Sequence, residues 1–255
     1  MCLIALAYQV HPGYPLILIA NRDEFYERPT REARFWVEEG HPDILAGKDL
    51  LAGGTWMGVQ KTGKWAALTN YRDLTRLKSD PPSRGELVLN YLKSNLSPDE
   101  YIRHLQPGAA AYNDFNLLIG DNQHILHYSN FSGKTTQLKP GIHGLSNALL
   151  NTPWHKTELL KARLEETIRH NKLDTNTLFQ LLTNETMADD DQLPETGLSK
   201  EMEKAISPAF IITEKYGTRC STLLLIDENG HMVFTERRFK PASRQIIGET
   251  EIKID

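Results

Sequence analysis

The second residue of the chain, Cys2, carries a thiol that could act as a nucleophile. A small residue at this position favours removal of Met1, which would leave Cys2 with a free α-amine. Such an amine titrates at ~7.7–8.0, against ~10.4 for a lysine, so an appreciable fraction is a neutral base at physiological pH. A thiol beside that base is an amine-activated nucleophile. The start of the chain therefore predicts acyl-transfer chemistry at Cys2.

A hairpin must bring other polar residues back towards this thiol. Leu3–Tyr8 and Leu16–Ala20 are apolar runs of strand length, and a turn rich in Pro and Gly separates them. If Pro12-Gly13 is the centre of the turn, paired positions sum to 25, which predicts Cys2 opposite Asp23.

The polar tetrapeptide Asn21–Glu24 then lies at the same sheet end as Cys2. Asp23 could orient the α-ammonium, and Arg22 could favour the thiolate by its charge. The alternative is that Cys2 is an ordinary buried residue of a first strand and that the tetrapeptide is a solvated loop.

A cysteine that transfers acyl groups also needs donors for the tetrahedral oxyanion, and side-chain amides at sheet ends can supply them. Asn70 follows the apolar run Trp65–Thr69, and Asn147 follows His143–Ser146. We expect these two amides to be the candidates. The alternative is that both are turn residues that end strands.

The order of elements is strands, paired helices, strands, paired helices and strands. Capping boxes at Ser83–Glu86 and Ser97–Glu100 predict helices over 84–95 and 98–106, and a second helical pair covers 153–170 and 175–183. Glu27–Gly47 is expected to be irregular, and Ala209–Thr213 is expected to be one of the closing strands. Helical pairs between antiparallel hairpins indicate an α+β, four-layer αββα sandwich of two antiparallel sheets.

Composition narrows the class of protein. The 255 residues show no linker, which predicts a single domain over 1–255. The 29 Lys+Arg against 33 Asp+Glu give a net charge of −4, which offers no footprint for nucleic acid. The sequence has no run of about 18 apolar residues, so it predicts no membrane span. The first apolar run is too short for a signal peptide, and we therefore expect a cytoplasmic protein.

The cysteines and histidines add little beyond Cys2. With only Cys2 and Cys220 no disulfide framework is implied, although one bridge stays open. The histidines show no paired-cysteine or His-Glu pattern, so no metal site is predicted.

The chain resembles the NRDE family, also called the transport and Golgi organisation protein 2 family, over nearly its whole length. The motifs that carry the resemblance are Met1–Ile4, Asn21–Glu24, Gly53–Gly58, Ala67–Arg72, Leu145–Asn147 followed by Pro153, Trp154 and Lys156, and Thr218–Thr222. The resemblance implies the fold of the N-terminal nucleophile (Ntn) hydrolases, particularly of the cysteine enzymes similar to bile-salt hydrolase and penicillin V acylase. Members of the family have been linked to haem trafficking.

The resemblance also assigns expected roles to residues. In the related cysteine hydrolases an asparagine after a Leu-Ser or Leu-Thr pair contributes to the oxyanion hole, as Asn147 and, less directly, Asn70 would here. Arg219 resembles their late arginine and could keep the thiol's surroundings positive or meet a substrate carboxylate; the alternative is a surface arginine. The related enzymes place their early arginine and aspartate three positions apart, whereas Arg22 and Asp23 are adjacent and face opposite sides of a strand.

Two functions follow as alternatives. The first is an amidohydrolase that needs no cofactor and acts on a small linear amide or acyl substrate. Its expected catalytic residues are Cys2, Arg22, Asp23, Asn70, Asn147 and Arg219, with Asn21, Glu24 and Trp56 as binding residues. The second is a carrier that holds haem without turning it over. A third possibility is an Ntn scaffold that has lost its chemistry and mediates contacts; the sequence does not set the oligomeric state.

Overall fold

A computed structural model describes residues 2–255, which form two compact units. The first unit joins the chain up to Glu27 with Lys139–Ile254, and the second is Arg28–Leu138 with Asp255. The single domain predicted over 1–255 stays a prediction beside this division. Among the described residues, no helix is both long enough and apolar enough to cross a membrane.

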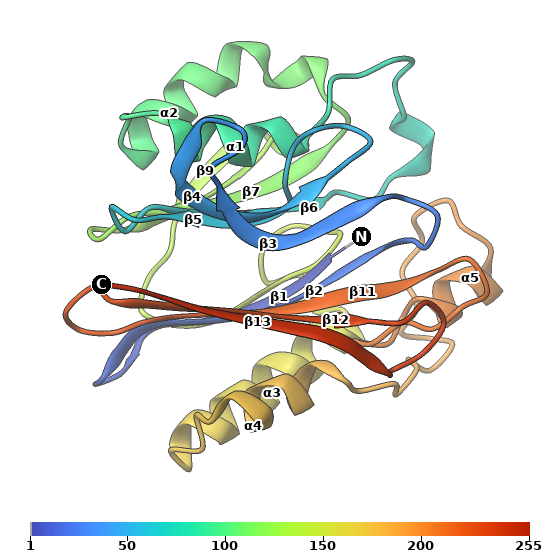
Figure 1. Ribbon diagram of the computed structural model, residues 1–255. Helices are drawn as coiled ribbons and strands as arrows, with labels where there is room; N and C mark the ends of the chain where they lie inside the picture. The colour runs from blue at the N-terminus through green and yellow to red at the C-terminus, as the bar shows by residue number, and fades with distance from the viewer. Residues whose placement is uncertain (1) are drawn as a thin grey trace. The chain divides into compact units, whose positions relative to one another are not determined.

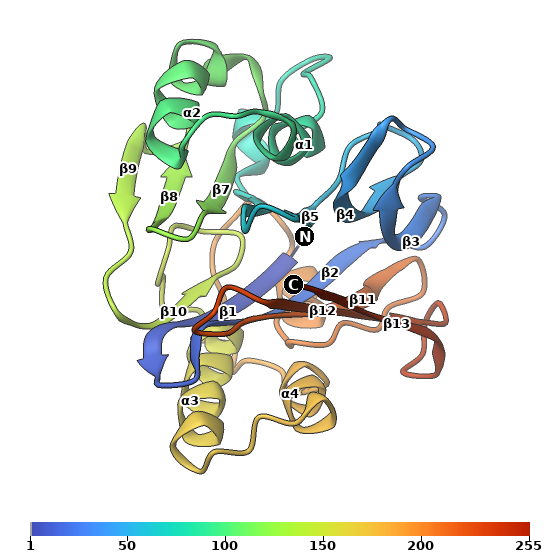
Figure 2. The same cartoon turned by 60° about the vertical axis from the view of Figure 1, so that its left-hand side comes forward.

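The first unit is a six-stranded antiparallel sheet in the order β10-β1-β2-β11-β12-β13. Helices α3 and α4 cover one of its faces (Figures 1 and 2). The elements are β1 Cys2–His11, β2 Tyr14–Phe25, β10 Gly141–Leu145, α3 His155–Arg169, α4 Thr175–Leu182, α5 Lys200–Ala205, β11 Tyr216–Ile226, β12 Met232–Phe239 and β13 Ile246–Ile254.

Alternation along the first two strands builds the core of this unit. Leu3, Ala5 and Ala7 of β1 and Ile17 and Ile19 of β2 point to one face, as the period of two in a strand requires. They pack against a stripe of helix residues, namely Leu160, Leu164, Leu178, Phe179 and Leu182. Residues of odd number on these two strands therefore face the helices, and those of even number face the other side.

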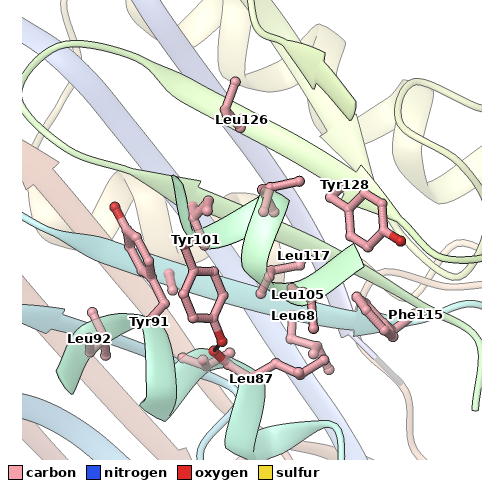
Figure 3. Close-up of a cluster of buried hydrophobic side chains, with 14 of the residues drawn as sticks. Leu68, Leu87, Tyr91, Leu92, Tyr101, Leu105, Phe115, Leu117, Leu126 and Tyr128 are labelled. Atoms are coloured by element: carbon pink, nitrogen blue, oxygen red, sulfur yellow. Dashed lines mark hydrogen bonds between the residues drawn. The ribbon is translucent and has the colours of Figure 1, made fainter. Parts of the chain in front are cut away.

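The second unit is a seven-stranded antiparallel sheet in sequential order from β3 to β9. Its elements are β3 Thr30–Trp36, β4 His41–Asp49, β5 Met57–Gln60, β6 Trp65–Asn70, the short 3-10 helix Leu74–Arg76, α1 Gly85–Lys93, α2 Pro98–Leu105, the 3-10 helix Gln106–Ala111, β7 Phe115–Gly120, β8 Ile125–Ser129 and β9 Lys134–Gln137. Tyr91 of α1 and Tyr101 of α2 meet edge to face over the apolar side chains of the sheet (Figure 3). The α+β class is thus confirmed.

The helix predictions hold better at α2 than at α1. The Ser97 hydroxyl accepts from the Glu100 N–H, and the Glu100 carboxylate accepts from the Ser97 N–H at 2.8 Å, which is the predicted capping box. The box predicted at Ser83–Glu86 is wrong, because Arg84 is the N-cap of α1 and makes no side-chain capping bond.

A close approach of the backbone shapes the start of α1. A Cβ on Gly54 would lie 2.5 Å from the carbonyl carbon of Gly85, and the Thr55 N–H donates to the Gly85 carbonyl at 3.1 Å. The glycine pair in the Gly53–Gly58 motif therefore has a packing reason within the second unit.

Two expected elements are wrong. Residues 27–47, expected to be irregular, contain most of the hairpin β3–β4. The apolar–polar alternation of these strands is hard to see in the sequence because it is interrupted by charged residues that form ion pairs, Arg31 with Glu39 and Arg34 with Glu38. Residues 209–213, expected to be a strand, make only an isolated bridge at Ile212. The apolar character of that segment comes from burial of a loop rather than from strand pairing.

A buried histidine makes the stability of the protein depend on pH. His127 on β8 donates to Asn116 Oδ1 at 3.1 Å, and burial lowers the pKa of His127 to about 4. The unfolded chain binds a proton near pH 6.5 and the folded chain does not, so stability should fall by roughly 3 kcal/mol as pH drops from 7 to 4.

The matched variant is His127→Gln, which keeps a donor for Asn116. Denaturant unfolding at pH 7 and pH 4 should show that the variant loses less stability than the wild type by about that amount. An equal loss in both proteins would contradict a buried neutral imidazole.

Candidate active site

Cys2 begins β1 and lies opposite Arg22 of β2. The predicted partner, Asp23, is wrong by one residue. The numbers of paired residues sum to 25, as predicted, at His11 and Tyr14. A β-bulge between Tyr8 and His11 changes this sum to 24 over the rest of the hairpin. Gln9 sits in this bulge with φ of 52°, and the extra residue shifts every later pair by one.

Arg22 lies between the two cysteines of the chain. It pairs with Cys2 on one side and with Cys220 of β11 on the other, and residues paired across a sheet point to the same face. Two strand spacings separate the cysteines by about 9–10 Å, beyond the Cα separation that a disulfide spans. Both are free thiols, so the bridge left open by the sequence is not formed.

The thiol of Cys2 is half-buried, and its surroundings favour the protonated form. Burial raises the pKa of Cys2, as do the carboxylates of Asp23 and Glu24, whereas Arg22 lowers it. The net effect is a raised pKa of Cys2, so a base must remove the thiol proton before the sulfur can attack.

Asn147 follows the end of β10, the strand that pairs with β1 on the side away from β2. The β1–β10 pairing ends with Ile4 opposite Leu145, and Asn147 comes two residues after that pair, beyond the strand. The Ser146 hydroxyl donates to the Cys2 carbonyl at 3.2 Å, which ties this loop to the strand. The Asn147 side chain is fully buried. The first unit thus pairs Cys2 with Arg22, and the Ser146 hydrogen bond ties the segment that contains Asn147 to the Cys2 carbonyl.

Asp23 occupies the face of the sheet that α3 and α4 cover, opposite to the face of Arg22. It pairs with Thr218, whose hydroxyl donates to Asp23 Oδ1 at 2.7 Å. Burial raises the pKa of Asp23, and the Lys156 ammonium of α3 is the strongest of the charges in the described chain that lower it. The expectation that Arg22 and Asp23 face opposite sides therefore agrees with this register.

A second bulge places Arg219. The β2–β11 pairing slips between Thr218 and Cys220, and Arg219 is the residue in between. Its guanidinium donates to the Phe25 carbonyl at 2.9 Å, and burial followed by the charge of Arg22 lowers the pKa of Arg219. Arg219 and Arg22 thus bring two guanidinium groups to this end of the sheet, where the carboxylates of Asp23 and Glu24 also lie.

The remaining residues of the tetrapeptide differ in burial. Asn21 is buried and donates both amide hydrogens to main-chain carbonyls, to Leu182 at 2.9 Å and Ala209 at 2.8 Å, while its Oδ1 accepts from Ser221 at 2.5 Å. Glu24 is half-buried and accepts from the Phe25 N–H at 2.9 Å. Asn21 therefore holds β2 to the end of α4, and its role in binding stays a prediction.

Two predicted residues belong to the second unit. Asn70 ends β6 and is half-buried. Trp56 precedes β5, and its ring covers Gly47, where a Cβ would lie 2.3 Å from the indole. Their roles as oxyanion donor and binding residue stay predictions.

Sequence reasoning missed Lys156, Ser146 and Thr218 as neighbours of the site. Lys156 did carry a signal, because it continues the buried stripe of Leu160 and Leu164 at a spacing of four along α3. A lysine in line with two core leucines indicates a buried ammonium that needs a partner.

Comparison with known proteins gives the family. The family model described as Transport and Golgi organisation 2 matches residues 1–241. The Transport and Golgi organization protein 2 homolog of Bos taurus is 37% identical over 258 residues, and that of Homo sapiens is 36% identical over 259 residues. Each alignment covers 93% of this chain and 92% of the relative.

A solved structure gives the fold. The C2A mutant of the conjugated bile acid hydrolase from Clostridium perfringens matches with a TM-score of 0.55 over 99% of this chain and 92% of that chain, at 11% sequence identity. The predicted Ntn-hydrolase-like fold is therefore confirmed. By the family match and the identity to these relatives, the chain belongs to the Transport and Golgi organisation 2 family.

Proposed function

We propose that this protein is an N-terminal cysteine amidohydrolase whose nucleophile is Cys2 once Met1 has been removed. Met1 itself lies outside the described residues. The observation that carries the proposal is the pairing of Cys2 with Arg22 at the end of the sheet where Ser146, the neighbour of Asn147, donates to the Cys2 carbonyl. The fold shared with a conjugated bile acid hydrolase supports it, since the name of that protein records a cysteine at its own second position.

The protonation state of Cys2 favours a mechanism with a built-in base. Because burial keeps the pKa of the thiol raised, little thiolate is present at neutral pH. The α-amine of the same residue titrates at ~7.7–8.0 and can accept the proton when it is neutral. This explains why the nucleophile and the terminus must belong to one residue.

The reaction then runs in two halves. The sulfur attacks the acyl carbon while its proton passes to the α-amine, and the carbonyl oxygen becomes an oxyanion that Asn147 can stabilise by donating from its amide. The C–N bond breaks, and the leaving amine takes the proton from the ammonium. Water, deprotonated by the α-amine, attacks the thioester; the acid leaves, and the sulfur regains its proton.

The positive charges of Arg22 and Arg219 indicate which class of substrate the site favours. Two guanidinium groups at the sheet end beside the nucleophile favour an acyl or amide compound that carries a negative charge, such as a carboxylate. We therefore propose a small linear amide with an anionic group as the substrate class.

The state of the N-terminus tests the function. Two preparations are compared, one whose intact mass shows loss of Met1 and one with an uncleaved N-terminal extension. Only the first should release amine from a panel of anionic N-acyl amides, because only it has a free α-amine at Cys2. Equal activity in both preparations, or no release by the processed protein, would overturn the proposal.

The alternative of a haem carrier stays a prediction from the family resemblance. A saturable Soret shift on titration with haemin is its expected result, and a flat titration at micromolar protein would contradict it.

A further inference from the structure

Tyr26 is a tyrosine to which the proposed reaction gives no task. It lies two residues after Glu24, just beyond β2, and its N–H donates to the Lys215 carbonyl at 2.9 Å. The residue is half-buried, and within residues 2–255 no hydrogen bond occupies its phenol oxygen. A tyrosine hydroxyl is both a donor and an acceptor, so it is available to a bound molecule.

Gly217 of β11 determines where this phenol lies. A Cβ on Gly217 would be 2.2 Å from the phenol oxygen of Tyr26, so the ring occupies the space of a side chain at that position. Gly217 pairs with Glu24 of β2. Glu24 is two residues from Arg22, which pairs with Cys2. Paired residues, and residues two apart on a strand, share a face of the sheet, so the phenol lies over the same face as the thiol.

The guanidinium of Arg219 lies beside Tyr26. It donates to the Phe25 carbonyl at 2.9 Å, and this carbonyl belongs to the peptide group that joins Phe25 to Tyr26. The nearby Glu24 carboxylate is turned back to the main chain, where it accepts from the Phe25 N–H at 2.9 Å. A phenol hydroxyl and a guanidinium are both donors, and together they suit a carboxylate of a ligand.

The spacing of the sheet sets the distance from this pair of donors to the nucleophile. Cys2 and Gly217 lie on β1 and β11, with β2 between them (Figure 1). Two strand spacings across the sheet and two residues along it give about 12 Å. Contact distances of about 3 Å at either end leave room for a chain of about six bonds between the acyl carbon and a carboxylate oxygen.

We propose that Tyr26 is a specificity residue, whose phenol binds, together with Arg219, a carboxylate about six bonds from the acyl carbon of the substrate. The substrate class is then a linear monoamide of a dicarboxylic acid, with adipamate as the member of matching length. This role rests on the proposed function, because it takes Cys2 as the nucleophile. Tyr26 itself lies too far from Cys2 to take part in the bond-breaking steps.

Binding of monoamides tests the subsite without any need for hydrolysis. Adipamate, the shorter succinamate and the longer sebacamate are titrated by calorimetry into processed Cys2→Ala protein. Adipamate should bind at least fivefold tighter than the other two, because its length matches the distance between the two ends of the site. The neutral diamide adipamide should bind at least tenfold more weakly than adipamate. Tightest binding of succinamate, or no binding of any monoamide, would overturn the proposal.

Tyr26→Phe keeps the ring over Gly217 and removes only the hydroxyl. In the same Cys2→Ala background it should weaken the binding of adipamate at least tenfold, as expected for the loss of a hydrogen bond to a charged group, and leave that of adipamide unchanged. Tyr14→Phe, at the other end of the β1–β2 hairpin, is the matched control and should change neither value. Unchanged binding of adipamate in Tyr26→Phe would overturn the role of the phenol.

In the active protein the same substitution should act on KM. Tyr26→Phe should raise the KM for adipamate at least tenfold and leave kcat within threefold of the wild type, because the phenol binds a part of the substrate that does not react. A residue that only supports the fold would show no such preference for the charged substrate over adipamide. A fall in kcat at unchanged KM would contradict a specificity role.

The two proposals fail in different ways. Selective binding of adipamate by a protein that hydrolyses no amide would overturn the proposed function and leave the subsite standing. An active processed protein whose binding of adipamate does not depend on Tyr26 would overturn the subsite and leave the nucleophile standing.

Discussion

Replacing Cys2 by alanine should lower amide hydrolysis by roughly 10⁴-fold or more, the loss seen when a covalent nucleophile is removed. The substitution deletes one half-buried sulfur at the start of β1, so the change in the free energy of unfolding should stay within about 1 kcal/mol. The substitution should therefore lower the rate of hydrolysis strongly while it changes the free energy of unfolding little. Initial rates of amine release measure the first, and denaturant midpoints measure the second.

Cys220→Ala is the matched control for this prediction. Cys220 lies in the same row of the sheet, but it is 3% exposed and burial raises its pKa well above the usual value, so it is a poor nucleophile. Its loss should leave the rate within a few-fold of the wild type. Mass spectrometry of the acylated protein should also find the added mass on Cys2. Acylation of Cys220, or an active Cys2→Ala protein, would contradict the assignment.

The part of the site that the sequence predicts is the part that local patterning controls. Two apolar runs around a Pro/Gly turn are enough to bring Cys2 and Asn21–Glu24 to one end of a sheet. The register is not predictable in this way, because the bulge at Gln9 depends on one residue with positive φ and leaves no mark in the apolar pattern. This shift of one residue places Arg22, rather than the predicted Asp23, opposite the thiol.

Contacts between distant segments are the other part that pattern reasoning cannot supply. Thr218 meets Asp23 across nearly two hundred positions of sequence, and Ser146 meets the Cys2 carbonyl from another distant segment. Side chains of this kind are polar, so in a sequence they look like surface residues. Only their burial in the folded chain shows that they have partners.

Replacing Asn21 by leucine should destabilise the protein by roughly 3–5 kcal/mol. Leucine is close to asparagine in size but makes no hydrogen bond. The carbonyls of Leu182 and Ala209 would lose the two donors that Asn21 provides, and the Ser221 hydroxyl would lose its acceptor. Each of these residues is buried, so water cannot replace the lost bonds without opening the structure.

The measurement is the midpoint of denaturant unfolding at constant slope, since a change in midpoint alone reports stability. Asn90→Leu, on the exposed face of α1, should change stability by no more than about 0.5 kcal/mol. Ser221→Ala, which removes one of the three bonds, should fall between the two. If Asn21→Leu kept the wild-type midpoint and lost only catalytic rate, Asn21 would act on the substrate, and the first residue of the Asn-Arg-Asp-Glu motif would belong to the reaction. The three buried bonds favour the opposite result: Asn21 holds the strand, and the chemistry depends on the residues that follow it.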